Sequence, residues 1–201
     1  MNEIYGLSGN GPGQSLGPAH DEHTAREHAF KTGKCMIRIL SSADLQEYLS
    51  SVSSDFNPAA KTTLGIQGYA EKLTRQGITI AATSDSFDTE GVLGILAGYF
   101  NNPGQGFSFV SAFHVRRPFR RMHIGKMLMD KAVGISIDSG FKTLRLKVDK
   151  DNGAGIGFYE RYGFVKIGES GTQFEMSFDL GTVPRADHNE SNKVGERKTF
   201  S

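Results

Sequence analysis

The sequence V-R-R-P-F-R-R-M-H-I-G-K, residues 115–126, decides the fold that we predict for this chain. An apolar run, residues 107–115, precedes the turn and an apolar-periodic run, residues 122–137, follows it, which indicates strand, basic turn and helix start. The first amides of a helix have no partner within the helix, and the helix dipole is positive there. We therefore interpret this turn, with four arginines and Lys126, as a phosphate-binding turn. The alternative is a solvated basic surface turn.

The composition indicates one domain with tails, without a strong overall charge. The 201 residues include 23 lysines and arginines and 22 aspartates and glutamates, for a net charge of +1, so nothing global favours nucleic acid or an anionic membrane. The single cysteine, Cys35, allows no internal disulfide, and a reducing cytoplasm is the expected compartment. No apolar run reaches the roughly 18 residues of a membrane-spanning helix, and no secretory pattern opens the chain.

The two ends of the chain differ in composition from its middle. Residues 1–34 are rich in glycine and lack apolar periodicity, so we predict a flexible N-terminal arm. Residues 182–201 are polar and charged and are predicted to be a flexible C-terminal tail, which leaves one domain over residues 35–181. The arm holds His20, His23 and His28, but no rigid fourth ligand accompanies them, and we expect no metal site.

The middle of the chain alternates predicted strands and helices. Strands are predicted over residues 36–40, 77–83, 91–100, 107–115, 143–148, 164–167 and 173–180, and helices over 42–54, 59–75, 122–137 and 152–162. We expect Ser42 to cap the first helix. This order predicts a layered α/β domain with a mostly antiparallel first half. The helix over residues 122–137 is a crossover, which should leave the strands on either side of it parallel.

Two segments that open predicted helices carry a family resemblance. Residues 120–126 read R-R-M-H-I-G-K, and residues 152–164 read N-G-A-G-I-G-F-Y-E-R-Y-G-F. They resemble the acetyl-CoA signature R/Q-x-x-G-x-G/A and the later segment N-x-x-A-x-x-[LF]-Y-x-[KR]-x-G-F of the GCN5-related N-acetyltransferase (GNAT) family. The resemblance covers about residues 36–180. It implies a mixed, mostly antiparallel sheet of six to seven strands, flanked by about four helices, with a splayed pair of parallel strands.

The resemblance also implies an activity and a set of site residues. The chain would be an acetyl-CoA-dependent N-acetyltransferase that moves an acetyl group directly to a primary amine of a small molecule. The backbone of residues 113–115 would pair with the pantetheine arm, Asn152 would contact that arm, and Tyr159 would act as general acid at the sulfur. The residues implied in coenzyme binding are Phe113, Val115, Arg120, Arg121, Met122, His123, Ile124, Gly125, Lys126, Asn152 and Tyr159.

The chain departs from the family pattern at two points. His123 stands where the family usually has its first glycine, and its side chain would either crowd the pyrophosphate or add a donor to it. The strand over residues 107–115 has no acidic residue, although the family often carries its general base there. An alkylamine with a pKa near ~10.4 needs help to lose a proton at neutral pH. The candidate bases are His114, Asp149 and ordered water. We assign His114, together with Tyr159, as catalytic, although His114 is equally consistent with packing against the sheet.

Two other functions compete with catalysis. A coenzyme-binding sensor without turnover is the alternative that the missing carboxylate and His123 motivate. A nucleic-acid module built on residues 116–121 ranks last, because only one aromatic residue interleaves the arginines. The turn G-Y-F-N-N-P, residues 98–103, resembles family members associated with bacterial surface sugars, so an amino sugar is one candidate acceptor beside amino acids, polyamines and protein N-termini. Apolar pairing of the closing strands would allow a homodimer.

Overall fold

The structure is a computed structural model that describes residues 35–56, 58, 62–84 and 91–184. The predicted N-terminal arm, with its three histidines, lies outside these described residues. So do residues 185–201 of the predicted tail.

A seven-stranded sheet with the order β1-β2-β3-β4-β5-β7-β6 forms the centre of the molecule. Its strands are β1 Cys35–Ile39, β2 Ile78–Ser84, β3 Val92–Tyr99, β4 Phe107–Val115, β5 Thr143–Asp149, β6 Val165–Ser170 and β7 Gln173–Asp179. Neighbouring strands run antiparallel except for β4 and β5, which are parallel. The predicted mixed, mostly antiparallel sheet is confirmed, and the helical crossover between β4 and β5 accounts for their parallel direction.

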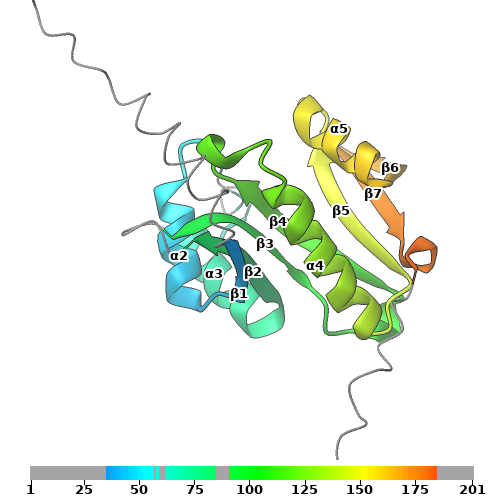
Figure 1. Ribbon diagram of the computed structural model, residues 1–201, viewed down its shortest axis with the longest axis horizontal. Coiled ribbons are helices and arrows are strands. Elements are labelled where there is room, and N and C mark those ends of the chain that lie inside the picture. Colours follow the sequence, from blue (N-terminus) through cyan, green and yellow to red (C-terminus); the bar gives the residue numbers. More distant parts are fainter. Residues whose placement is uncertain (1–34, 57, 59–61, 85–90, 185–201) are drawn as a thin grey trace, which may run out of the picture.

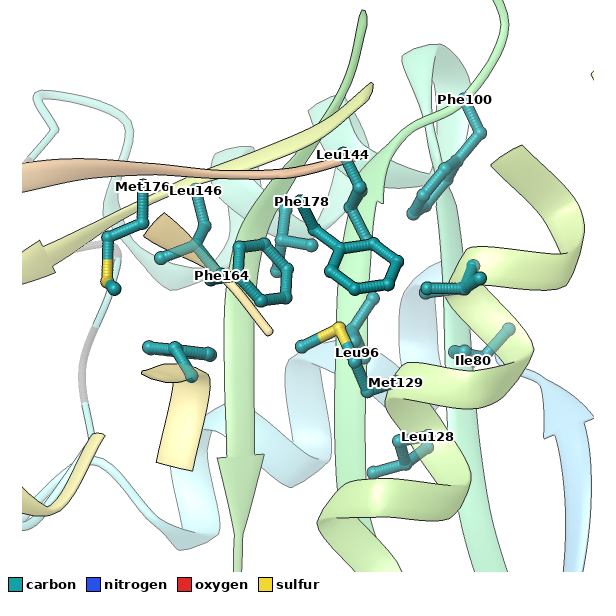
Figure 2. Packing of buried hydrophobic residues seen from close by; sticks show 14 of the residues in the cluster. Ile80, Leu96, Phe100, Leu128, Met129, Leu144, Leu146, Phe164, Met176 and Phe178 are labelled. Atoms are coloured by element: carbon teal, nitrogen blue, oxygen red, sulfur yellow. The ribbon is translucent and has the colours of Figure 1, made fainter. Parts of the chain in front are cut away.

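Helices cover both faces of this sheet. Within the described ranges they are α2 Ser42–Ser51, α3 Gly65–Gln76, α4 Ile124–Asp138 and α5 Gly153–Tyr162. Figure 1 shows α4 lying along one face, α2 and α3 behind the opposite face, and α5 beside the end of β5. The core is therefore divided into two apolar clusters, one on each face. Figure 2 shows the α4 side, where Leu128 and Met129 share a cluster with Leu96 and Phe178.

The cap of α2 and the start of α3 differ from the sequence-based prediction. Ser41, rather than Ser42, caps α2, because its hydroxyl accepts from the Asp44 amide while the Asp44 carboxylate accepts from the Ser41 amide. The second helix was predicted from residue 59, but α3 begins at Gly65. Gly65 has a φ of +65°, and a left-handed residue cannot continue a right-handed helix. Residues 59–61 of that prediction lie outside the described ranges.

A bulge in β4 separates it from β5 partway along the sheet. Gly98 pairs with Val110 and Ala97 pairs with Ala112, so Ser111 is an extra residue on β4. The β4–β5 register covers only Phe107–Val110 and Thr143–Leu146. Beyond this point the two strands diverge, as Figure 1 shows toward the top of the view. The predicted splayed pair is present, and it leaves one edge of residues 111–115 without a neighbouring strand.

Candidate active site

The turn between β4 and α4 has a backbone suited to anions. Arg121 and His123 both have left-handed φ values, 66° and 58°, on either side of Met122. Alternation between the two signs of φ turns successive amides toward one side, as in anion-binding nests. Histidine is among the residues that tolerate this conformation best after glycine. His123 therefore adopts the backbone that the family's glycine would supply, and its side chain is exposed.

The amides of this turn are free to bind a ligand. The first intrahelical bond of α4 runs from the Met127 amide to the His123 carbonyl oxygen, at 3.0 Å. For the N–H groups of residues 121–126, the part of the chain that the structure describes provides no acceptor, and His123 offers no side-chain cap. Six adjacent donors at the positive end of a fifteen-residue helix have the arrangement that favours anions in general.

The arginine side chains do not surround this turn as the sequence suggested. Arg116 donates through Nε to the Val92 carbonyl at 2.9 Å and through a terminal nitrogen to the Ser51 hydroxyl at 2.8 Å. Arg117 donates to the Asp55 carboxylate at 3.0 Å. Both side chains thus connect the end of β4 with neighbouring strand and helix residues, because α2 and the loop after it offer the acceptors. The predicted convergence of five cations is wrong for these two.

Two of the three other cations of the turn are also engaged, whereas Arg121 is exposed and its side chain has no hydrogen bond or ion pair among the described residues. Arg120 donates through Nε to the Val115 carbonyl at 2.9 Å, and a terminal nitrogen lies 3.5 Å from the Asp55 carboxylate. Lys126 pairs with Asp130 one helical turn later, at 2.7 Å. Such exposed pairs contribute little and exchange readily. The main chain, rather than a ring of cations, is therefore the principal anion-binding feature of this turn.

The free edge of β4 presents main-chain groups to the gap between the diverging parts of β4 and β5. The Arg116 amide donates to the Leu93 carbonyl, and hydrogen-bonded positions alternate along an antiparallel pair. His114 is then the next residue bonded to β3, whereas the N–H and C=O groups of Phe113 and Val115 point away from β3. The Val115 carbonyl is occupied by Arg120, which leaves the Phe113 groups and the Val115 amide for an extended ligand.

Tyr159 of α5 lies across the gap from Phe113. The two ring centroids are 6.1 Å apart, and the Tyr159 ring also contacts Phe158 and Phe164, at 5.5 and 5.7 Å. Tyr159 is buried, and burial raises the pKa of its phenol above the usual value. Among the described residues its hydroxyl has no hydrogen-bond partner, so the phenol is a protonated donor that is not committed to another side chain.

Two more predicted residues lie near this gap. Asn152 caps α5, where its Oδ1 accepts from the Gly155 amide at 2.9 Å, so only its Nδ2 remains for a ligand. Gly125 lies against the rings of the gap: a Cβ added there would be 3.2 Å from Phe113 and 3.5 Å from Phe158. This glycine allows the start of α4 to approach the ring that borders the gap.

His114 is packed under α2 and the loop that follows it. Its Nδ1 is 2.7 Å from the Tyr48 hydroxyl, its ring stacks on Phe56 with centroids 4.7 Å apart, and its Nε2 lies 3.5 Å from Arg120. Burial lowers the pKa of His114 to about 4, opposed by the Asp55 carboxylate and reinforced by the neighbouring guanidinium groups. A neutral imidazole with this pKa is a weak base, and its contacts favour a role in packing.

Asp149, the remaining candidate base, and a hydrogen-bonded pair of Tyr69 and Ser111 also lie in this region. The Asp149 carboxylate accepts from Gln173 on β7, at 3.0 Å, at the end of β5. Sequence reasoning missed Tyr69 of α3, whose hydroxyl is 2.8 Å from the Ser111 hydroxyl at the bulge. No sequence signal distinguished Tyr69 from an ordinary core aromatic, because the bulge that it contacts is invisible to periodicity.

The described residues contain neither a candidate membrane-spanning helix nor a candidate metal-binding group. No helix in the part of the chain that the structure covers is long and apolar enough to cross a membrane. No group of three or more histidine, cysteine, aspartate or glutamate side chains within the same residues is arranged to hold a metal ion.

Comparison with known structures finds the same fold. Ard1 from Thermoplasma volcanium is 23% identical, with 73% of this chain and 97% of that chain covered and a TM-score of 0.57. The ribosomal-protein-S18-alanine N-acetyltransferase from Escherichia coli is 15% identical, with 83% and 99% covered and a TM-score of 0.58. The PaiA N-acetyltransferase from Thermoplasma acidophilum, in complex with coenzyme A, is 19% identical, with 72% and 98% covered and a TM-score of 0.53.

The sequence itself matches a family model. A comparison with curated proteins finds no match. The model described as the acetyltransferase (GNAT) family matches residues 45–164, which is more than half of the chain and includes β2, β3, β4 and β5, the turn at residues 121–126 and α5. With this match, and with the splayed strands and free amides that accompany it, the chain belongs to the GNAT family of acetyltransferases.

Proposed function

We propose that this protein is an acetyl-CoA-dependent N-acetyltransferase that acts on a primary amine of a small molecule. The observation that carries the proposal is the row of six amides at residues 121–126 that have no acceptor among the described residues. They lie next to a strand edge at Phe113, whose ring is 6.1 Å from the ring of Tyr159. The amides would hold the pyrophosphate, and the edge at Phe113 and Val115 would hold the pantetheine arm. The coenzyme supplies the activated acetyl thioester, and the chain's own residues position it and manage the protons.

Acetyl transfer requires one proton to leave and one to arrive. The amine nitrogen forms a bond to the thioester carbonyl carbon as the carbon–sulfur bond breaks, and the nitrogen loses a proton. The Tyr159 hydroxyl donates its proton to the departing sulfur and recovers one from solvent. The thiol has a reference pKa near ~8.5, so a raised phenol pKa makes this transfer uphill, and the hydrogen bond matters most while charge develops on sulfur.

In this proposal the amine loses its proton to bulk solvent before it reaches the site, so no side chain has to act as a strong base. His114 is not assigned as the base. Proton transfer from an alkylammonium ion to its imidazole would be uphill by about 6 pKa units, or about 8 kcal/mol, because burial lowers the pKa of His114. Asp149 already accepts a hydrogen bond from Gln173, although it can order a water molecule at the end of β5. The reacting species is therefore the neutral amine, whose concentration grows with pH.

The test is a transfer assay with purified full-length protein. Acetyl-CoA is incubated with a panel of small primary amines, and mass spectrometry compares the acetylated amine with the free thiol released. The proposal predicts an N-acetylated product formed in equal amount to free coenzyme A. Tight coenzyme binding in a calorimeter without transfer to any member of the panel, including peptides with free N-termini, would instead identify a coenzyme-binding module. Transfer restricted to peptides would contradict the small-molecule acceptor.

A further inference from the structure

A separate pocket opens beside the last turn of α3. Its volume is about 510 Å³, within the roughly 300–1,000 Å³ of ordinary ligand clefts. It lies where β4 begins, toward the end of that strand opposite the turn at residues 121–126. The residues that line it come from α3, the end of β3, the β3–β4 connection, the start of β4 and the α4–β5 connection: Gln76, Tyr99, Asn101, Asn102, Gln105, Phe107, Phe109 and Phe141.

The lining combines aromatic rings with carboxamides and contains no charged side chain. Asn101 uses its Nδ2 to donate to the Gln76 carbonyl oxygen, at 2.8 Å. The other carboxamides, on Gln76, Asn102 and Gln105, make no hydrogen bond to any residue that the structure describes, and all three are exposed. A carboxamide offers two donors and two acceptor positions, which suits hydroxyl groups that both donate and accept.

This chemistry selects one class of ligand. Rings provide apolar faces, and free carboxamides provide paired donors and acceptors, so a ring with several hydroxyl groups matches both. None of the lining residues is charged, and the guanidinium that stacks on the Phe107 ring, that of Arg145, is paired with Glu175 at 3.7 Å. An anion or a cation would therefore lose hydration without an unpaired opposite charge to compensate. The match is therefore a neutral, sugar-like ring.

The pocket borders the gap in which transfer would occur. Phe109 precedes Val110, the last β4 residue that pairs with β5, so the pocket ends where the gap begins. Along α3, Tyr69 at the bulge and Gln76 at the pocket are separated by seven residues, or about 10 Å. We infer that this pocket binds a neutral, sugar-like part of the acceptor and places an amine within about 10 Å at the gap. The delivery of the amine rests on the proposed function, whereas binding of the ring does not.

Binding can be tested without turnover. The side-chain amide signals of Asn102 and Gln105 in ¹⁵N–¹H spectra of the full chain would be followed during titration with methyl glycosides of neutral hexoses and with glucuronic acid. We expect saturable shifts with the neutral glycosides. The double variant Asn102→Leu/Gln105→Leu should bind them about tenfold more weakly, because two hydrogen-bonding groups are lost. The control Gln46→Leu, which removes an exposed carboxamide on α2, should bind them like the wild type.

A transfer assay then links the pocket to the acceptor. The double variant should lower kcat/KM for amino sugars about tenfold relative to kcat/KM for a simple alkylamine. Absence of saturable shifts with neutral glycosides, or stronger shifts with glucuronic acid, would overturn the pocket assignment even if alkylamines are acetylated. Glycoside binding without transfer to any amine would refute the proposed function while leaving the ring-binding site in place. An unchanged ratio of kcat/KM values would refute the role of the pocket in acceptor recognition.

Discussion

Replacement of Tyr159 by phenylalanine tests whether the phenol hydroxyl supplies the proton that the departing sulfur needs. The hydroxyl has no hydrogen-bond partner among the described residues, and the ring contacts with Phe113, Phe158 and Phe164 survive the substitution. The free energy of unfolding should therefore change by less than about 1 kcal/mol. A positioned general acid contributes about 10²–10⁴-fold, so kcat should fall by that factor, equivalent to about 3–5 kcal/mol, while KM for acetyl-CoA stays within about twofold.

The assay compares thiol release and acetylated product for wild type and Tyr159→Phe at saturating amine. A control exists on the same helix: Tyr162 donates to Asp130 at 2.8 Å, so Tyr162→Phe should cost about 1 kcal/mol of stability and leave kcat unchanged. An acetyl thioester of a more acidic thiol should reduce the effect of Tyr159→Phe, because its sulfur needs less protonation. A kcat for Tyr159→Phe within about threefold of wild type would refute the assigned role.

Three further predictions concern the turn, the buried histidine and the amine. Gly125→Val should raise KM for acetyl-CoA about tenfold or more, since the added atoms meet Phe113, whereas Gly134→Val, whose Cβ meets no neighbour, should not; equal KM values would contradict the close approach. Because the pKa of His114 is lowered to about 4 in the folded protein, the free energy of unfolding should fall by up to about 3 kcal/mol as the pH falls from about 6.5 to 4. In urea unfolding, the free energy of unfolding of His114→Gln should depend less on pH over this range. If water accepts the amine proton, log kcat/KM for the amine should rise with a slope of about 1 between about pH 6 and pH 9, and a plateau near neutrality would point to a side-chain base instead.

Periodicity predicted most of the sheet because its strands bury alternate residues. Phe107–Val115 was predicted with the bounds that β4 has, and its burial alternates along the whole strand. The start of α3 was missed, because a glycine inside an apolar-periodic segment gives no sign of its own φ. The bulge at Ser111 was missed for a related reason: one extra residue is set by pairing with β3, which local sequence does not encode.

The site was predictable where it depends on main chain and less so where it depends on long side chains. Strand, turn and periodicity predicted a helix from Met122, two residues before α4 begins at Ile124, and a helix start in this position brings the free amides with it. The directions of Arg116 and Arg117 depend on acceptors on Ser51 and Asp55, more than 60 residues away in sequence. The pocket beside Gln76 likewise joins residues from α3, β3, β4 and two connections, so no single segment of the sequence predicts it.

The central claim is that main-chain N–H groups at residues 121–126 bind a diphosphate, and amide chemical shifts measure this directly. In ¹⁵N–¹H spectra of the full chain, titration with coenzyme A should produce the largest shifts at the amides of these six residues, as new acceptors reach them. Pantetheine, which lacks the diphosphate, should leave the same amides almost unmoved. Shifts of residues 121–126 that are equal with the two ligands, or coenzyme A binding that leaves these amides unchanged, would contradict the account.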